Sequence, residues 1–159
     1  MDDIMKPRYA LLFVLLLVVA LGCPKRTTAP IHDAAQTGDI DEVETLIREG
    51  SDVDAISTDE QADAALHRAV GAGNIDVAKT LIRAGADVNI RTGRFGWTPL
   101  HIAATKGNNA MVKLLIESGA DINVLDGNGY SPLDYAIAKG KPDTAELLRA
   151  YGAVSGGEK

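Results

Sequence analysis

Four copies of one short pattern follow one another along this chain, and this repetition limits what the chain can fold into. The first half of the pattern reads IHDAAQTG, LHRAVGAG, LHIAATKG and LDYAIAKG, ending at residues 38, 73, 107 and 140. The second half ends in REG, RAG, ESG and AYG, at residues 50, 85, 119 and 152. Both sets of final glycines are spaced by 35, 34 and 33 residues. A period of this length indicates a stack of small units that share one continuous core.

The third copy shows how each half of the pattern forms a helix. Thr98 can accept hydrogen bonds at a helix N-terminus, and Pro99 suits the first turn, where its missing N–H costs nothing. Apolar residues then recur at helical spacing, and Gly107 can end the helix in a left-handed conformation. The second half repeats this logic and ends at Gly119, and Gly73 and Gly85 hold the corresponding places in the second copy. We therefore expect two short helices per copy and an extended turn before the next copy.

The sequence GWTPLHIAATKGN…VKLLIESGADIN is similar to the standard unit of the ankyrin-repeat family, and the resemblance covers about residues 29–153. It implies an all-α solenoid of about four helix-turn-helix units joined by extended turns called fingers. The expected domain is 31–153, with units at about 31–62, 63–95, 96–128 and 129–153. The last copy carries charged residues on its second helix, as expected of a terminal unit that faces water.

The three histidines of the chain, His32, His67 and His101, all occupy the same repeat position. The family resemblance implies that each bonds to the backbone and to the turn of the neighbouring unit. The sequence contains no phosphate-binding glycine loop, no HExxH or CxxC motif, and no spacing that supports a Ser-His-Asp triad. We therefore expect no enzymatic activity, no cofactor, no metal site and no small-molecule substrate. The formal charge of −6 also argues against nucleic acid as a partner.

The fingers differ most between copies, and ankyrin-repeat proteins bind partner proteins mainly through finger tips and the exposed side of the first helices. The connection between the first two copies is two residues longer than standard, and the next is one residue longer. Exposed aromatic and arginine side chains are common interface anchors. The candidate partner-binding residues are Asp59, Glu60, Arg91, Arg94, Phe95, Trp97, Lys106, Asn128, Tyr130 and Lys139. For Trp97 a second reading stays open, in which it packs on Tyr130 and stiffens the stack.

The N-terminus carries an apolar run, YALLFVLLLVVALGC, that is preceded by Lys6 and Arg8. This order is typical of a secretory signal, and its end resembles a bacterial lipobox. The resemblance implies cleavage before Cys23 and attachment of a lipid to the Cys23 sulfur. A plain cleaved signal or a short anchor are the alternatives. We expect a signal peptide at 1–22, a tether at 23–30 and a disordered tail at 154–159.

These features together predict a membrane-tethered docking module that faces the periplasm of a bacterial cell envelope. Its partners would be another protein and, through the lipid, the membrane. Two roles stay open at this point. The module either holds an envelope protein in place as a scaffold, or it is an immunity or inhibitor protein that blocks a toxin or hydrolase.

Overall fold

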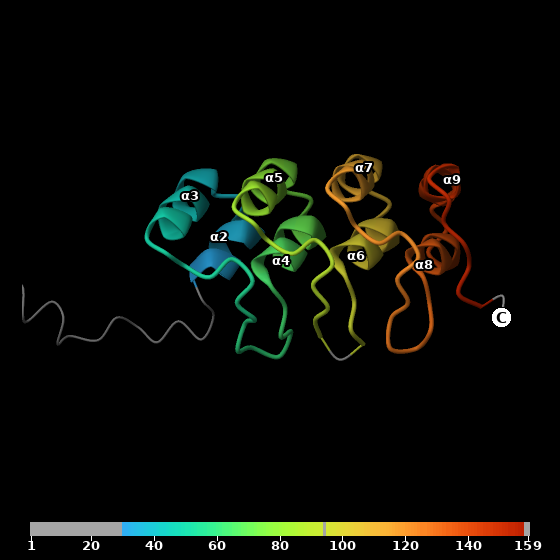
Figure 1. Ribbon diagram of the computed structural model, residues 1–159, viewed down its shortest axis with the longest axis horizontal. Helices are drawn as coiled ribbons and strands as arrows, with labels where there is room; N and C mark the ends of the chain where they lie inside the picture. Colours follow the sequence, from blue (N-terminus) through green and yellow to red (C-terminus); the bar gives the residue numbers. More distant parts are fainter. Residues whose placement is uncertain (1–29, 94, 158–159) are drawn as a thin grey trace, which may run out of the picture.

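The computed structural model describes residues 30–93 and 95–157, and these residues form eight helices in four pairs. The pairs are α2 (Pro30–Thr37) with α3 (Ile40–Arg48), α4 (Ala65–Ala72) with α5 (Ile75–Arg83), α6 (Pro99–Lys106) with α7 (Asn109–Glu117), and α8 (Pro132–Ala138) with α9 (Pro142–Ala150). They stand in one row, with α2 and α3 at one end and α8 and α9 at the other (Figure 1). No strand forms within the described ranges. The all-α repeat architecture predicted from the sequence is confirmed.

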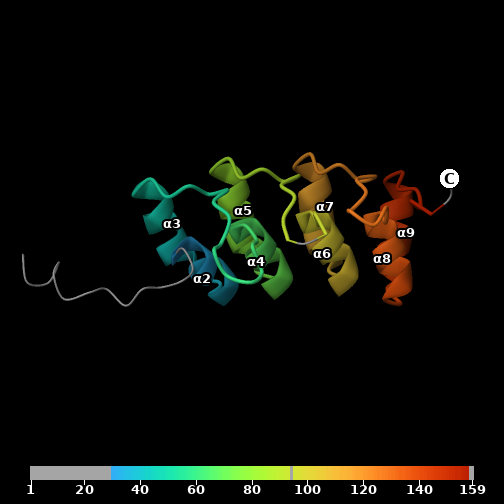
Figure 2. The ribbon, with the colours of Figure 1, turned by 90° about the horizontal axis from the view of Figure 1, so that it is seen from below.

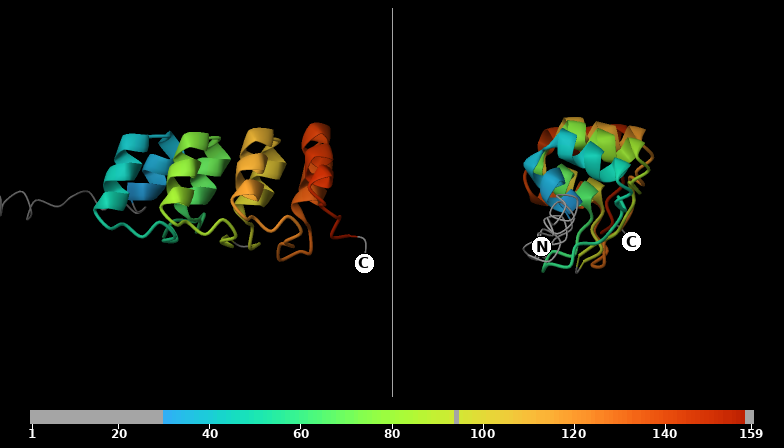
Figure 3. Two further views of the ribbon diagram at one scale, coloured as in Figure 1. Left: turned by 45° about the horizontal axis from the view of Figure 1, so that its top comes forward. Right: turned by 90° about the vertical axis from the view of Figure 1, so that its left-hand side faces the viewer.

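The stack has two helical layers and a row of fingers. The first helices, α2, α4, α6 and α8, lie nearer the fingers, and the second helices lie on the far side (Figure 1). The three connections between pairs all project to the same side of the stack (Figures 2 and 3). We call them finger one (49–64), finger two (84–98) and finger three (118–131). The first helices and the fingers therefore share one face of the molecule, which we call the finger face.

Small side chains at fixed repeat positions allow the pairs to stack closely. Each first helix buries one alanine at the same position, and the four are Ala34, Ala69, Ala103 and Ala136. The second helices contribute larger apolar groups to the same core, and Leu81, Leu115 and Leu148 are fully buried. Because one unit is too thin to cover its own apolar side, most of this burial is supplied by the neighbouring units.

Gly107 shows why a glycine ends the first helix of the pattern. Its φ is +77°, in the left-handed region that other residues rarely adopt. A Cβ at this position would also lie only 2.8 Å from the side chain of Lys141 in the next unit. The backbone turn therefore disfavours a side chain here, and the Lys141 side chain would have to shift to make room for one.

The described part of the C-terminal tail, residues 154–157, packs against the stack, whereas the sequence predicted a disordered tail at 154–159. The N–H of Val154 donates to Asn123 Oδ1 at 2.9 Å, and the N–H of Gly156 donates to Asp134 Oδ2 at 2.8 Å. Asn123 lies in finger three and Asp134 lies in α8. The tail takes up these acceptors.

The predicted signal peptide, Cys23, the predicted tether as far as residue 29, Arg94 and residues 158–159 lie outside the described residues. Within the described residues, none of the helices has both the length and the apolar content needed to cross a membrane.

Candidate functional site

The fingers are joined to one another by backbone hydrogen bonds. The N–H of Gly93 in finger two donates to the carbonyl of Ala62 in finger one at 3.1 Å. The N–H of Gly127 in finger three donates to the carbonyl of Phe95 in finger two at 2.7 Å. These bonds connect residues 31 and 32 positions apart in the chain, so the fingers form one continuous row rather than three independent loops.

Arg91, one of the predicted partner-binding residues, adds a side-chain link to this row. Its Nη2 donates to the carbonyl of Leu125 in finger three at 2.7 Å. The residue remains exposed. Arg91 therefore links fingers two and three and is also accessible to a partner.

The histidines connect each first helix to the finger that follows it. Their Nε2 atoms lie 2.9–3.1 Å from one carbonyl oxygen each, in the pairs His32 with Ala55, His67 with Trp97, and His101 with Tyr130. Burial lowers the pKa of His67 and of His101 below its ordinary value. Both rings are therefore neutral at pH 7, and Nε2–H donates to the carbonyl. The three rings lie along the stack and do not converge on one point.

His101 and His67 differ in the contacts of the other ring nitrogen, Nδ1. His101 Nδ1 accepts the backbone N–H of Thr98 at 3.1 Å and lies 2.9 Å from the Thr98 hydroxyl. In the unit before, Ala64 stands where Thr98 would be, and it has no hydroxyl. His67 is 2% exposed, and its Nδ1 finds no hydrogen-bond partner among the described residues. The second unit thus lacks an interaction that the third unit has.

A cluster around Arg68 fixes finger one instead. Arg68 is 8% exposed, and its Nε donates to Asp63 Oδ1 at 2.8 Å while Nη2 forms an ion pair with Asp59. Its Nη1 also donates to Gln36 in the preceding helix at 3.1 Å, and Ser57 donates to Asp59 at 2.9 Å. The hydrogen bond from Arg68 lowers the pKa of Asp59 to about 2. Finger one is therefore held to α4 and α2 by a buried cation.

This cluster changes the place of one predicted residue. Asp59 was expected to face a partner, but its carboxylate is paired with Arg68 inside the chain. Glu60, beside it, is exposed. The sequence analysis missed Arg68, although a signal was present: Arg68 holds the repeat position of Ile102 and Tyr135, and it occurs beside the longest finger.

A second cluster surrounds the carboxylate of Asp126, which is 5% exposed. Its Oδ2 accepts the hydroxyl of Tyr135 at 2.6 Å and Nε1 of Trp97 at 3.2 Å, and its Oδ1 accepts the backbone N–H of Tyr130 at 3.0 Å. Burial raises the pKa of Asp126, but these hydrogen bonds outweigh it, so the pKa lies below its usual value and the group stays ionised. One carboxylate therefore joins finger two, finger three and α8.

Trp97 packs within the stack, but its neighbour there is Tyr135 and not Tyr130. The Trp97 ring packs edge-on against Tyr135, with centroids 4.7 Å apart, and Tyr130 also packs on Tyr135, at 6.0 Å. Trp97 and Tyr130 thus share Tyr135 as a neighbour. Trp97 is half-buried in this joint, whereas Tyr130 is 51% exposed.

A comparison with protein families decides what kind of stack this is. A family model described as ankyrin repeats, in three copies, matches residues 8–92 and 85–155. The chain belongs to the ankyrin-repeat family. A comparison with curated proteins found no match. Ankyrin repeats are in general non-enzymatic modules that bind other proteins, and this places the present chain among protein–protein interaction modules.

Most of the predicted contact residues of this ankyrin stack are open to solvent on the finger face. The exposed ones are Glu60, Arg91, Phe95, Lys106, Asn128, Tyr130 and Lys139. Among them Phe95, at the tip of finger two, and Tyr130, in finger three, are apolar groups that are 49% and 51% exposed. Single exposed apolar residues are common on protein surfaces, but two on adjacent, connected fingers mark a candidate contact area.

A hollow of about 300 Å³ opens beside Phe95 on the finger face of the ankyrin stack. Its walls come from fingers one and two and from the first helices, and the lining residues are Gln61, Asp63, His67, Thr92, Gly93, Phe95, Trp97 and Ile102. A neighbouring hollow of about 240 Å³ shares four of these residues and extends along α4 to Gly71 and Ala72. At the positions of Gly71 and Ala72, α2 carries Gln36 and Thr37 and α6 carries Thr105 and Lys106, so α4 has the smallest residues of the three helices there.

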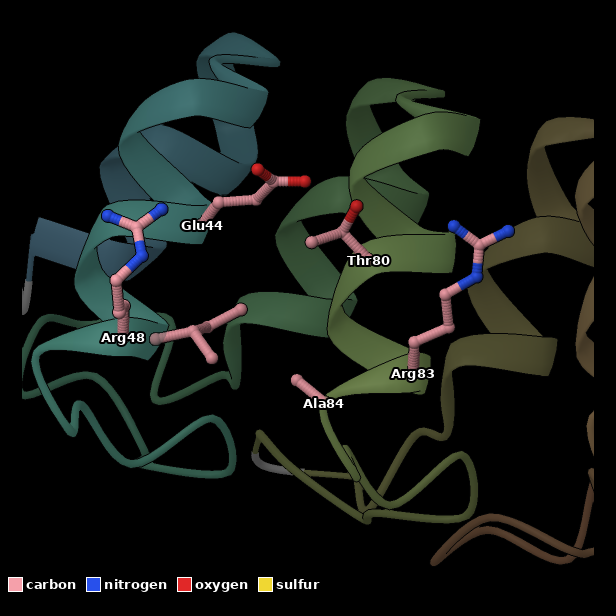
Figure 4. A pocket seen from close by; sticks show the side chains of 6 residues that line it. Glu44, Arg48, Thr80, Arg83 and Ala84 are labelled. Atoms are coloured by element: carbon pink, nitrogen blue, oxygen red, sulfur yellow. The ribbon is translucent and has the colours of Figure 1, made fainter.

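Another hollow, also of about 300 Å³, lies between the second helices α3 and α5 (Figure 4). It is lined by Glu44, Arg48, Thr80 and Arg83, together with Ile47 and Ala84. Arg48 and Arg83 lie at the C-terminal ends of their helices, where a cation interacts favourably with the helix dipole. The mixed charges are typical of a solvated helix surface. The described residues contain no group of His, Cys, Asp or Glu side chains suited to hold a metal ion.

Proposed function

We propose that this ankyrin-repeat chain docks one partner protein on its finger face, with Phe95 and Tyr130 as the main contacts. Half-exposed aromatic side chains bury a large area when a partner covers them, and such residues dominate the energy of many interfaces. The hollow beside Phe95 gives a partner side chain a place to insert. No chemical step is part of this function.

The observation that carries the proposal is the backbone bond between Gly127 and Phe95, at 2.7 Å. It holds the tip of finger two against finger three, so the backbone positions that carry the two exposed rings are joined before any partner arrives. A surface that is already ordered loses little conformational freedom on binding. The finger face is thus suited to recognise a partner of defined shape.

A pull-down from membranes tests the docking surface. The bait is the full chain as wild type, as Phe95→Ala with Tyr130→Ala, and as Tyr151→Ala. Tyr151 is 42% exposed but lies at the end of α9, away from the finger face, and therefore serves as a matched control. We expect the partner to be lost with the double variant and retained with the control. Equal capture by all three baits would contradict the proposal.

We propose further that the chain is a lipoprotein, tethered through Cys23 to a membrane of the bacterial envelope and facing the periplasm. The support is the apolar run that ends at Cys23, the only cysteine of the chain. Helix α2 begins at Pro30, seven residues after Cys23, and seven extended residues reach only ~24 Å. A partner held by this stack would stay close to the bilayer surface.

Substitution of the cysteine tests the tether. We expect Cys23→Ala to move the chain from the membrane fraction to the soluble fraction, because the lipid could no longer be attached. The partner assay separates the possible roles. A scaffold changes where the partner is found and leaves its activity unchanged, whereas an inhibitor lowers that activity.

A further inference from the structure

The C-terminal tail continues the hydrogen-bond ladder that links the units. Asp54 accepts the backbone N–H of Asp87 at 3.0 Å, and Asn89 accepts that of Asp121 at 2.7 Å. At the end of the stack, Asn123 accepts the N–H of Val154 at 2.9 Å. The same repeat position thus binds the start of the next connection each time. The tail takes the place that a fourth finger would occupy.

Contacts further along hold the tail against finger three and α8. The hydroxyl of Ser155 donates to the Asp134 carboxylate, and the N–H of Gly156 donates to the same group. Gly156 lies so close to finger three that a Cβ would collide with the carbonyl oxygen of Gly129 and the side chain of Leu125. The position of the tail therefore depends on a glycine at residue 156.

The tail and α8 enclose a hollow of about 280 Å³ together with finger three. Its lining residues are Tyr130, Asp134, Tyr135, Ala138 and Gly157. The two tyrosine rings are set at 71° with their centroids 6.0 Å apart. Aromatic rings carry negative charge on their faces and attract cations that approach within about 6 Å. Ala138 keeps the space beside the rings open.

Fixed negative charge surrounds this hollow. Asp134 lies in its wall, and Asp126 lies behind Tyr135 and accepts its hydroxyl at 2.6 Å. Burial raises the pKa of Asp134, but the hydrogen bonds from Ser155, Ser131 and Gly156 outweigh it, so the pKa is lowered and the carboxylate stays ionised. The nearest cation along the chain, Lys139, is exposed and does not line the hollow. Two carboxylates and two aromatic rings together favour a cationic ligand.

We propose that the hollow between Tyr130, Tyr135 and the C-terminal tail binds the guanidinium group of an arginine that a partner protein presents. A guanidinium is flat, stacks on aromatic rings and is more weakly hydrated than an ammonium group, so it suits an aromatic wall better than a lysine does. This inference rests on the proposed docking function, since a partner supplies the arginine. It adds the chemistry that the partner must carry at this end of the finger face.

A titration of the full chain with methylguanidinium chloride tests the site without any partner. The ring proton shifts of the tyrosines are followed by NMR, with methylurea as the uncharged probe of similar shape. We expect saturable shifts at Tyr130 and Tyr135 with methylguanidinium and none with methylurea. Tyr151, which is exposed and does not line the hollow, is the internal control for general effects of salt. Equal shifts at Tyr151, or equal shifts with methylurea, would overturn the proposal.

Two variants show whether the rings and the tail form the site. Tyr130→Leu keeps an apolar side chain but removes the ring, and we expect binding of methylguanidinium to weaken about fivefold. Gly156→Val should displace the tail and weaken binding similarly, while the helical circular dichroism stays unchanged. Binding at wild-type strength in either variant would rule the site out. Failure here leaves the pull-down with Phe95→Ala and Tyr130→Ala unaffected, so the two proposals fail separately.

Discussion

The second and third ankyrin units show two ways of fixing a finger to the helix that follows it. In the third unit, the His101 ring binds the start of α6. Its Nδ1 accepts the backbone N–H of Thr98 and lies 2.9 Å from the Thr98 hydroxyl. In the second unit Ala64 replaces the threonine, His67 Nδ1 stays without a partner, and Arg68 binds the longer finger through Asp59 and Asp63. In the second unit a buried ion-pair cluster thus fixes the finger, whereas in the third unit a helix cap does so.

The largest loss of stability is expected for His101, because both of its ring nitrogens make hydrogen bonds. His101→Ala removes hydrogen bonds on both ring nitrogens and leaves a cavity in a fully buried site, so we expect a loss of about 3 kcal/mol in the free energy of unfolding. His67→Ala should cost about 1 kcal/mol less, because one of its nitrogens makes no bond. Chemical denaturation followed by circular dichroism measures both. Equal losses would mean that the two units do not differ as described.

The ion-pair cluster of the second unit is the next target. Arg68→Met leaves two partly buried carboxylates without their cation, and we expect a loss of about 2 kcal/mol. Arg83→Met, on the exposed far side, is the control and should change stability by less than about 0.5 kcal/mol. Adding Asp59→Asn to Arg68→Met should restore part of the loss. A loss for Arg68→Met no larger than the control would show that finger one does not need its cation.

The missing cap of the second unit can be restored. Ala64→Thr gives His67 Nδ1 the hydroxyl that Thr98 offers to His101, and we expect a gain of about 1 kcal/mol. Ala64→Val has nearly the same shape without the hydroxyl, so it should bring no such gain. If both variants raise the melting temperature equally, the effect comes from packing and not from the hydrogen bond.

The smallest effect expected is a dependence of stability on pH. Burial lowers the pKa of His67 and His101, so the folded chain binds fewer protons than the unfolded chain as the pH falls toward the ordinary histidine pKa of about 6.5. The free energy of unfolding should therefore fall as the pH decreases, by a few tenths of a kcal/mol between pH 7 and 6.5. His101→Gln should flatten this slope. A stability that rises over the same interval would contradict the assignment of neutral rings.

The helix pairs were predictable from the sequence because their signals are local. Thr98 with Pro99 starts a helix and Gly107 ends it, and the repeat period sets the distance to the next pair. The two clusters were not predictable in the same way. Arg68 meets carboxylates of a finger whose path depends on its extra length, and Asp126 binds the side chain of Trp97, which lies 29 residues earlier in the chain.

The candidate contact surface was predicted only in outline. The positions of Phe95 and Tyr130 on the fingers followed from the repeat pattern, but their exposure depends on neighbouring side chains. Trp97 has the same repeat position as Tyr130 and yet is half-buried, because Asp126 and Tyr135 bind its ring. The order of the tail also could not be read locally, since its acceptors lie 21 to 31 residues earlier in the sequence.

The contact of Trp97 with Asp126 and Tyr135 gives the molecule an internal optical reporter. Trp97 is the only tryptophan of the chain; its indole nitrogen lies 3.2 Å from the Asp126 carboxylate in finger three, and its ring packs on Tyr135 of the fourth unit. Its fluorescence therefore depends on the joint between the third and fourth units, while circular dichroism records all the helices together. If the last unit separates first on heating, the emission of Trp97 will change before the helical signal does, and the order in which a four-unit stack comes apart can be followed without any added label.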